Sequence, residues 1–175
     1  MKLFQSYRIA PWEPEIIGVD TLEEVVQLIH SEDDVDDELV GNTEQAIELG
    51  IEDLEDSDID VYDSESVIVT REALRAVYGH VYTGMRAGNQ FRGVPMVIHN
   101  HVPPDPKILP ELLIQLETQA RIATVEDLED WYWDFVTINP FTMGNNVIGG
   151  IILSAVSWFL QGNYLVEVTE GVHYD

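Results

Sequence analysis

The sequence predicts one mainly α-helical domain, and three observations support this fold class. The chain has 175 residues, of which 45% are apolar, so it can bury a substantial core. Apolar residues recur at helical spacing in several segments, whereas strict alternation is confined to short stretches. Glycine and proline separate these segments. We expect an acidic N-terminal appendage at 1–65, a helical core with a short β-hairpin flap at 66–162, and an extended tail at 163–175.

The acidic appendage is expected to hold an extended arm and two short helices. Residues 3–9 are interpreted as a short strand or arm, because two nearby prolines oppose a long helix. Residues 20–29 carry apolar side chains on one helical face and begin with residues that can cap a helix. A second short helix starts near residue 41 and is expected to close at Gly50.

The core is expected to be built from four helices around a flap. Residues 66–85 form the first helix, with Thr70 as a possible cap. A short extended segment at 94–98 then leads to His99-Asn100-His101, and the prolines that follow forbid a helix, so this part is predicted to form a β-hairpin flap. The remaining helices are predicted at 108–118, 125–137 and 148–160, and residues 164–168 alternate like a strand.

Charge limits the classes of partner. The formal net charge is −25, and residues 20–65 contain 19 acidic side chains and no lysine or arginine. We expect no direct binding to nucleic acid, because phosphate contacts need cationic side chains. The acidic run indicates either a solvated helical face or a surface for a basic protein partner. Salt adaptation of the source and imitation of nucleic acid are also compatible with it.

Other composition features exclude several kinds of site. No apolar run has the length of a membrane span, and the first residues do not resemble a secretory signal, so we expect a cytoplasmic protein without membrane contact. The absence of cysteine excludes disulfides and zinc-thiolate sites. The segment 56–60 resembles a calcium loop, but Val61 and Val67 replace its glycine and glutamate. His99 and His101 are too few for a metal site. We expect no metal and no cofactor.

The stretch 135–150 connects two predicted helices through a tight polar turn. Pro140, Gly144 and Asn145 favour a turn at this point. The turn leads into a helix N-terminus, whose first backbone N–H groups have no partner within the helix and can bind an anion. Gly144, Asn145 and Asn146 are therefore the candidate anion-binding or ligand-binding residues.

Four motifs follow one another along residues 66–162, at 87–92, 97–106, 108–113 and 139–150, and their order resembles that of the Fic family. In that family a "pG-x-[YF]-R" turn follows the opening helix, as 87–92 does here, and a flap ending in prolines follows, as at 97–106. A "vp-x-L" helix start is similar to 108–113, and the signature H-P-F-x-[DE]-G-N-G-R-x-x-R is similar to 139–150. Fic proteins transfer AMP, or another phosphate-containing group, to a hydroxyl of a target protein.

The resemblance also implies which groups perform that reaction. In the family the histidine is the general base, the Asp/Glu holds Mg²⁺, the Gly-Asn turn binds an anion, and the arginines neutralise phosphate. Here Asn139 stands at the base position, Met143 at the metal position, and Val147 and Gly150 at the two arginine positions, while Asn146 replaces the second glycine. The positions that match are Pro140, Phe141, Gly144 and Asn145. No catalytic residue is therefore expected.

The leading hypothesis is a catalytically inactive Fic-like protein that binds a protein partner through an acidic surface. One alternative is a nucleotidyl- or phosphoryl-group transferase with altered chemistry, in which His99 or His101 on the flap replaces the lost base. Another is an acidic decoy that imitates nucleic acid. A small acidic protein with a degenerate signature would suit a phage or mobile-element gene. The sequence leaves the partner, the source and the oligomeric state open.

Overall fold

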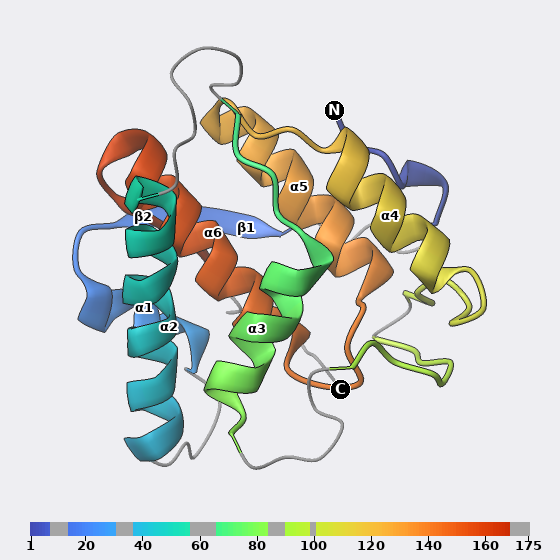
Figure 1. Ribbon diagram of the computed structural model, residues 1–175, viewed down its shortest axis with the longest axis horizontal. Helices are drawn as coiled ribbons and strands as arrows, with labels where there is room; N and C mark the ends of the chain where they lie inside the picture. Colours follow the sequence, from blue (N-terminus) through green and yellow to red (C-terminus); the bar gives the residue numbers. More distant parts are fainter. Residues whose placement is uncertain (8–13, 31–36, 57–65, 84–89, 99–100, 169–175) are drawn as a thin grey trace.

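The computed structural model describes residues 1–7, 14–30, 37–56, 66–83, 90–98 and 101–168. Within this part of the chain, the fold consists of six α-helices and one two-stranded antiparallel sheet (Figure 1). The elements are η1 Gln5–Tyr7, β1 Glu15–Val19, α1 Leu22–Ile29, α2 Asp37–Asp56, α3 Arg71–Val81, α4 Leu109–Gln119, α5 Val125–Ile138, α6 Asn145–Gln161 and β2 Tyr164–Val168. The predicted mainly α class is confirmed.

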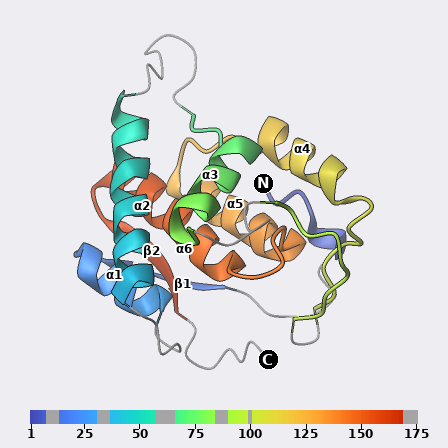
Figure 2. The ribbon, with the colours of Figure 1, turned by 60° about the horizontal axis from the view of Figure 1, so that its bottom comes forward.

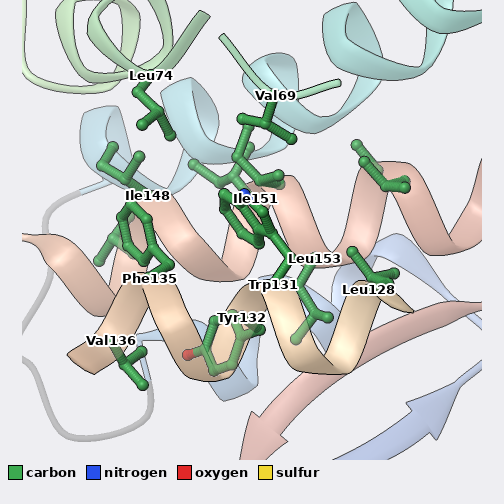
Figure 3. Close-up of a cluster of buried hydrophobic side chains, with 14 of the residues drawn as sticks. Val69, Leu74, Leu128, Trp131, Tyr132, Phe135, Val136, Ile148, Ile151 and Leu153 are labelled. Atoms are coloured by element: carbon green, nitrogen blue, oxygen red, sulfur yellow. The ribbon is translucent and has the colours of Figure 1, made fainter. Parts of the chain in front are cut away.

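Helix α6 lies at the centre of the fold. Every residue from Val147 to Ser157 is buried, because α1, α2, α3, α5 and β2 all pack against this helix. A helix that is apolar all round in this way is stable only in the interior. Figure 3 shows Phe135 of α5 beside Ile148 of α6, and Trp131 of α5 beside Ile151 of α6. The rings of Trp131 and Phe135 stack with centroids 5.1 Å apart, and both side chains are buried.

The N-terminal part of the chain closes onto the C-terminal part. Strand β1 pairs antiparallel with β2, with Val19 opposite Tyr164 (Figure 2). The strand predicted at 164–168 is confirmed. Residues 3–9 were expected to form a short strand or an extended arm, and the strand alternative is wrong for Gln5–Tyr7, which form η1. The backbone N–H groups of Leu3 and Phe4 donate to the carboxylate of Asp134 and so are not paired in a sheet.

Helix α2 is much longer than the sequence predicts. It runs through Gly50 to Asp56, although the sequence favoured a stop at this glycine. A Cβ atom at Gly50 would lie 3.2 Å from the Cβ of Ala155, so the glycine allows α2 to approach α6 closely. Ala46 and Ile47 of α2 belong to the same buried cluster as α5 and α6. The segment expected as an appendage therefore shares the core of the helices that follow it.

Helix α3 begins later than predicted. Its N-cap is Thr70, as expected, and the Thr70 hydroxyl accepts a hydrogen bond from the N–H of Ala73 at 3.0 Å. The residues before it are extended instead of helical, because Val67 exchanges two backbone hydrogen bonds with Ile122, at 2.7 and 3.0 Å. Among the described residues, no helix is both long and apolar enough to cross a membrane.

Candidate functional site

The loop between α5 and α6 is framed by two residues in the left-handed conformation. Asn139 ends α5 with φ 48° and ψ 67°, and its N–H donates to the carbonyl of Phe135 at 2.9 Å. Gly144 precedes α6 with φ 75°, a conformation that glycine adopts at little cost. A Cβ atom at Gly144 would also lie 2.6 Å from the hydroxyl of Tyr82. The glycine that the sequence placed in this turn is therefore required by both backbone and packing.

A buried arginine holds the end of α5. The Nε of Arg92 donates to the carbonyl of Asn139 at 2.7 Å, and its Nη2 donates to those of Ile138 and Pro104 at 3.0 and 2.6 Å. The last carbonyls of a helix carry partial negative charge and lack partners within the helix, so a guanidinium suits them. Burial lowers the pKa of Arg92, and the negative charge of Asp105 opposes this shift. Arg92 thus ties the flap region to the loop.

The side chain of Asn145 closes the loop from the other end. Its Oδ1 accepts from the N–H of Phe141 at 2.8 Å, and its Nδ2 donates to the carbonyl of Phe141 at 2.7 Å. The Phe141 ring is fully buried and packs against Tyr78 and Phe91, with centroids 4.6 and 5.3 Å apart. Both polar atoms of the Asn145 amide are therefore used inside the loop. Any anion here would have to be bound by backbone N–H groups at the start of α6.

A pocket of about 340 Å³ lies between the loop and the flap segment, and we call it the loop pocket. The structure brings together five of the residues singled out from the sequence and adds Met96 and Thr142. The residues that line the pocket are Met96, Val97, Ile98, Val136, Asn139, Thr142, Met143, Gly144, Asn145 and Asn146. None of these described lining residues is charged. The Nδ2 of Asn139 lies 2.9 Å from the sulfur of Met96 and so joins the loop to the flap segment.

The two positions that correspond to arginines in the Fic signature do not face the loop pocket. Val147 is buried in the core and is 4% exposed. A Cβ atom at Gly150 would lie 3.1 Å from Cγ1 of Ile29, because α1 covers this part of α6. A long cationic side chain at either position would have to displace core packing.

The flap residue His101 packs inward. His101 and Ile98 exchange two backbone hydrogen bonds of 2.8 Å each, as the predicted hairpin requires. The imidazole is fully buried, and its Nε2 lies 2.8 Å from the carbonyl of Thr137 on α5. It does not line the loop pocket. His99 and Asn100 lie outside the described residues.

The part of the chain that is described contains no candidate metal-binding centre. No group of three or more His, Cys, Asp or Glu side chains is placed there so as to hold a metal ion. Residues 57–60 of the calcium-like segment lie outside the described ranges, so this expectation is not addressed by the structure.

The sequence reasoning missed Asp134, a buried carboxylate on α5 that binds the N-terminal backbone. Its Oδ1 accepts from the N–H groups of Leu3 and Phe4 at 2.9 and 3.0 Å. Burial raises the pKa of Asp134 from 3.8 to about 6, although these hydrogen bonds act in the opposite direction. An acidic residue in the apolar run 131–138 was the only indication in the sequence.

No protein-family model matches the chain, and no curated protein matches it in sequence. Its function is therefore inferred from the geometry and chemistry of the described residues.

Proposed function

We propose that the chain is a Fic-like protein that has lost the family's group-transfer chemistry and acts by binding a protein partner. One observation carries the proposal. The signature positions Asn139, Met143 and Gly144 surround a single pocket, but the described lining of that pocket contains no base, no carboxylate and no cation. An amide cannot take a proton near neutral pH, and a thioether is no ligand for Mg²⁺.

The order of the elements supports the resemblance. Helix α3, the flap hairpin, α4, α5, the loop and α6 follow one another as the Fic motifs do. The positions that match the signature have structural roles in this chain, since Asn145 closes the loop and Phe141 is buried beneath it. A fold can retain such residues after its chemistry is lost, because they hold the loop in place.

The surroundings of the loop pocket oppose binding of a nucleotide polyphosphate. Val147 and Gly150 provide no positive charge and are packed against other elements. The only buried cation next to the loop, among the described residues, is Arg92, and its guanidinium is committed to backbone carbonyls. A net charge of −25 further repels polyphosphate.

Two surfaces favour binding to a protein. Apolar side chains remain exposed on the flap and the loop, with Val97 62% and Met143 47% exposed. Helix α2 carries eight acidic residues and no basic residue, which favours a partner with positive charge. The alternative of a flap histidine acting as base loses support at His101, because its ring is buried against α5.

Calorimetric titration with ATP and Mg²⁺, together with transfer of a labelled nucleotide to protein targets, tests the loss of chemistry. We expect neither heat of binding nor labelling. A matched variant, Asn139→His with Met143→Asp, should remain inactive as well, since the two arginines are still missing. Robust transfer by the unmodified protein would contradict the proposal.

The binding half of the proposal has a separate test, capture of partners from cell extract at low and high salt. A partner released by salt would be held by the acidic face of α2, whereas a partner retained at high salt would be held by the apolar flap and loop. If no partner is retained under either condition, the binding proposal fails.

A further inference from the structure

A second hollow, of about 360 Å³, lies between α2 and α3 above α6, and we call it the α2–α3 groove. Figure 1 shows α2 and α3 side by side over α6, and the three helices contact one another. The extended segment 67–69 forms part of the wall. Small residues from these elements, among them Ala46, Gly50, Ala76 and Ala155, line the groove.

The edges of this groove expose large apolar side chains. Leu49 on α2 is 46% exposed and Ile68 is 40% exposed, and both line the groove. The apolar residues Ile152 and Val156 of α6 line the same groove. Covering such a surface would remove more apolar area from water, which is the main favourable term in association.

The charges around the groove are of one sign. Asp53 lines it, and Glu52 and Asp56 lie beside Leu49 on the exposed side of α2. No lysine or arginine occurs among the described residues that line the groove. A second copy of this chain, with a net charge of −25, would be repelled, whereas a cationic surface would be attracted.

The side chain of His80 on α3 also lines the groove. The Nε2 of His80 is buried and makes no hydrogen bond within the part of the chain that the structure describes. A buried imidazole nitrogen without a partner costs free energy unless another molecule supplies one. A lysine or serine side chain of a bound protein could supply it.

We propose that the α2–α3 groove binds an amphipathic helix of a basic protein partner. This inference rests on the proposed binding function and assigns a place to it. The groove follows α2 from Ala46 to Leu54, a length of about 12 Å at 1.5 Å per residue. That length accommodates three apolar side chains of a helix at positions i, i+4 and i+7, with lysine or arginine residues beside Asp53 and Glu52.

The probe is a synthetic amphipathic helix of about 14 residues made of leucine and lysine, long enough to cover the groove. Two control peptides have the same leucine pattern with glutamate in place of lysine, or the same composition in scrambled order. Fluorescence anisotropy measures their binding to the full chain at low and high salt. Only the leucine–lysine helix should bind, and salt should weaken it.

Matched variants locate the binding site. Ile68→Ser, in the groove, should weaken binding about fivefold to tenfold, because one apolar anchor is lost. Ile114→Ser on α4, where the isoleucine is similarly exposed at 44%, should leave binding unchanged. Asp53→Asn should weaken binding about twofold and reduce its salt dependence, whereas Asp20→Asn, which changes the same charge outside the groove, should not.

Three results would overturn the inference. Equal loss in the Ile68 and Ile114 variants, or in neither, would place the peptide elsewhere on the acidic surface. Equal binding of the glutamate peptide would show that charge does not select the occupant. The free protein could also dimerise. If Ile68→Ser abolished this dimerisation and Ile114→Ser did not, the groove would be assigned to a second copy of the chain. The nucleotide-transfer assay does not involve the peptide, so failure of this inference is distinguishable from failure of the proposed function.

Discussion

The loop pocket and the α2–α3 groove have similar volumes, about 340 and 360 Å³. They differ in how far their polar groups are hydrogen-bonded within the protein. At the loop, Arg92 and Asn145 bond the backbone groups that the turn leaves open. In the groove, the Nε2 of His80 has no partner among the described residues, and Asp53 is exposed. Two pockets of similar volume can therefore differ in origin. One lies beside a turn whose polar groups are bonded within the protein, and the other leaves polar groups available to a bound molecule.

The largest expected effect is at the loop, from Arg92→Met. The substitution leaves three buried carbonyl groups without their donor, so the free energy of unfolding should fall by about 3 to 5 kcal/mol. Arg71→Met is the matched control, because its partly exposed ion pair with Glu117 contributes only about 0 to 1 kcal/mol. Urea unfolding measures both. Similar losses in the two variants would remove the special role of Arg92.

The buried carboxylate of Asp134 should make stability depend on pH. Its pKa is raised from 3.8 to about 6, so the folded state holds the proton more tightly than the unfolded state between these values. The free energy of unfolding should therefore decrease as pH rises from about 4 to about 6, by up to about 3 kcal/mol from this group. Asp134→Asn should abolish this part of the dependence, because an amide does not titrate in this range. Parallel pH profiles for the two proteins would contradict the assignment.

A smaller effect distinguishes two neighbours in the loop pocket. Asn145→Ala leaves the N–H and carbonyl of buried Phe141 unpaired and should cost about 2 kcal/mol. Asn146→Ala, which removes a half-buried amide from the same pocket, should change stability by less than about 0.5 kcal/mol. Thermal unfolding compares them. Equal effects would mean that the loop is not held by the Asn145 bonds.

The smallest effect is expected in the groove. Ile68→Ser and Ile114→Ser remove side chains of similar exposure, so both should cost about 1 kcal/mol or less. A much larger loss for Ile68→Ser would show that the groove is part of the stabilising core instead of an open surface. Urea unfolding of the two variants side by side decides this.

The sequence predicted those elements whose structure is determined by residues close to one another in the chain. Helix α5 was expected over 125–137 and spans Val125–Ile138, because apolar residues at helical spacing mark it. Strand β1 was missed because its pairing depends on β2 at the other end of the chain. Gly50 was misinterpreted because a glycine that ends a helix and a glycine that allows close packing are identical in sequence.

The same distinction applies to the site. Asn139, Met143 and Gly144 were found from the sequence because they lie within one short stretch that resembles the Fic signature. Met96 was missed because only the folding of the flap brings it to the loop, and its sulfur is 2.9 Å from Asn139 Nδ2. Ile29 packs over Gly150, although the two residues are far apart in the chain. No local sequence pattern could have predicted this contact.

The closure of the N-terminal part onto the C-terminal part has a consequence for the order of folding. The bond between Leu3 and Asp134 spans 131 residues, and β1 pairs with β2 over a still longer separation. Such contacts carry a high loop-closure entropy, so they should form after the local helix pairs α5–α6 and α2–α3. Substitutions in β1 should then speed unfolding and leave the folding rate almost unchanged, whereas substitutions at the α5–α6 contact should slow folding. Stopped-flow kinetics in urea would record that asymmetry.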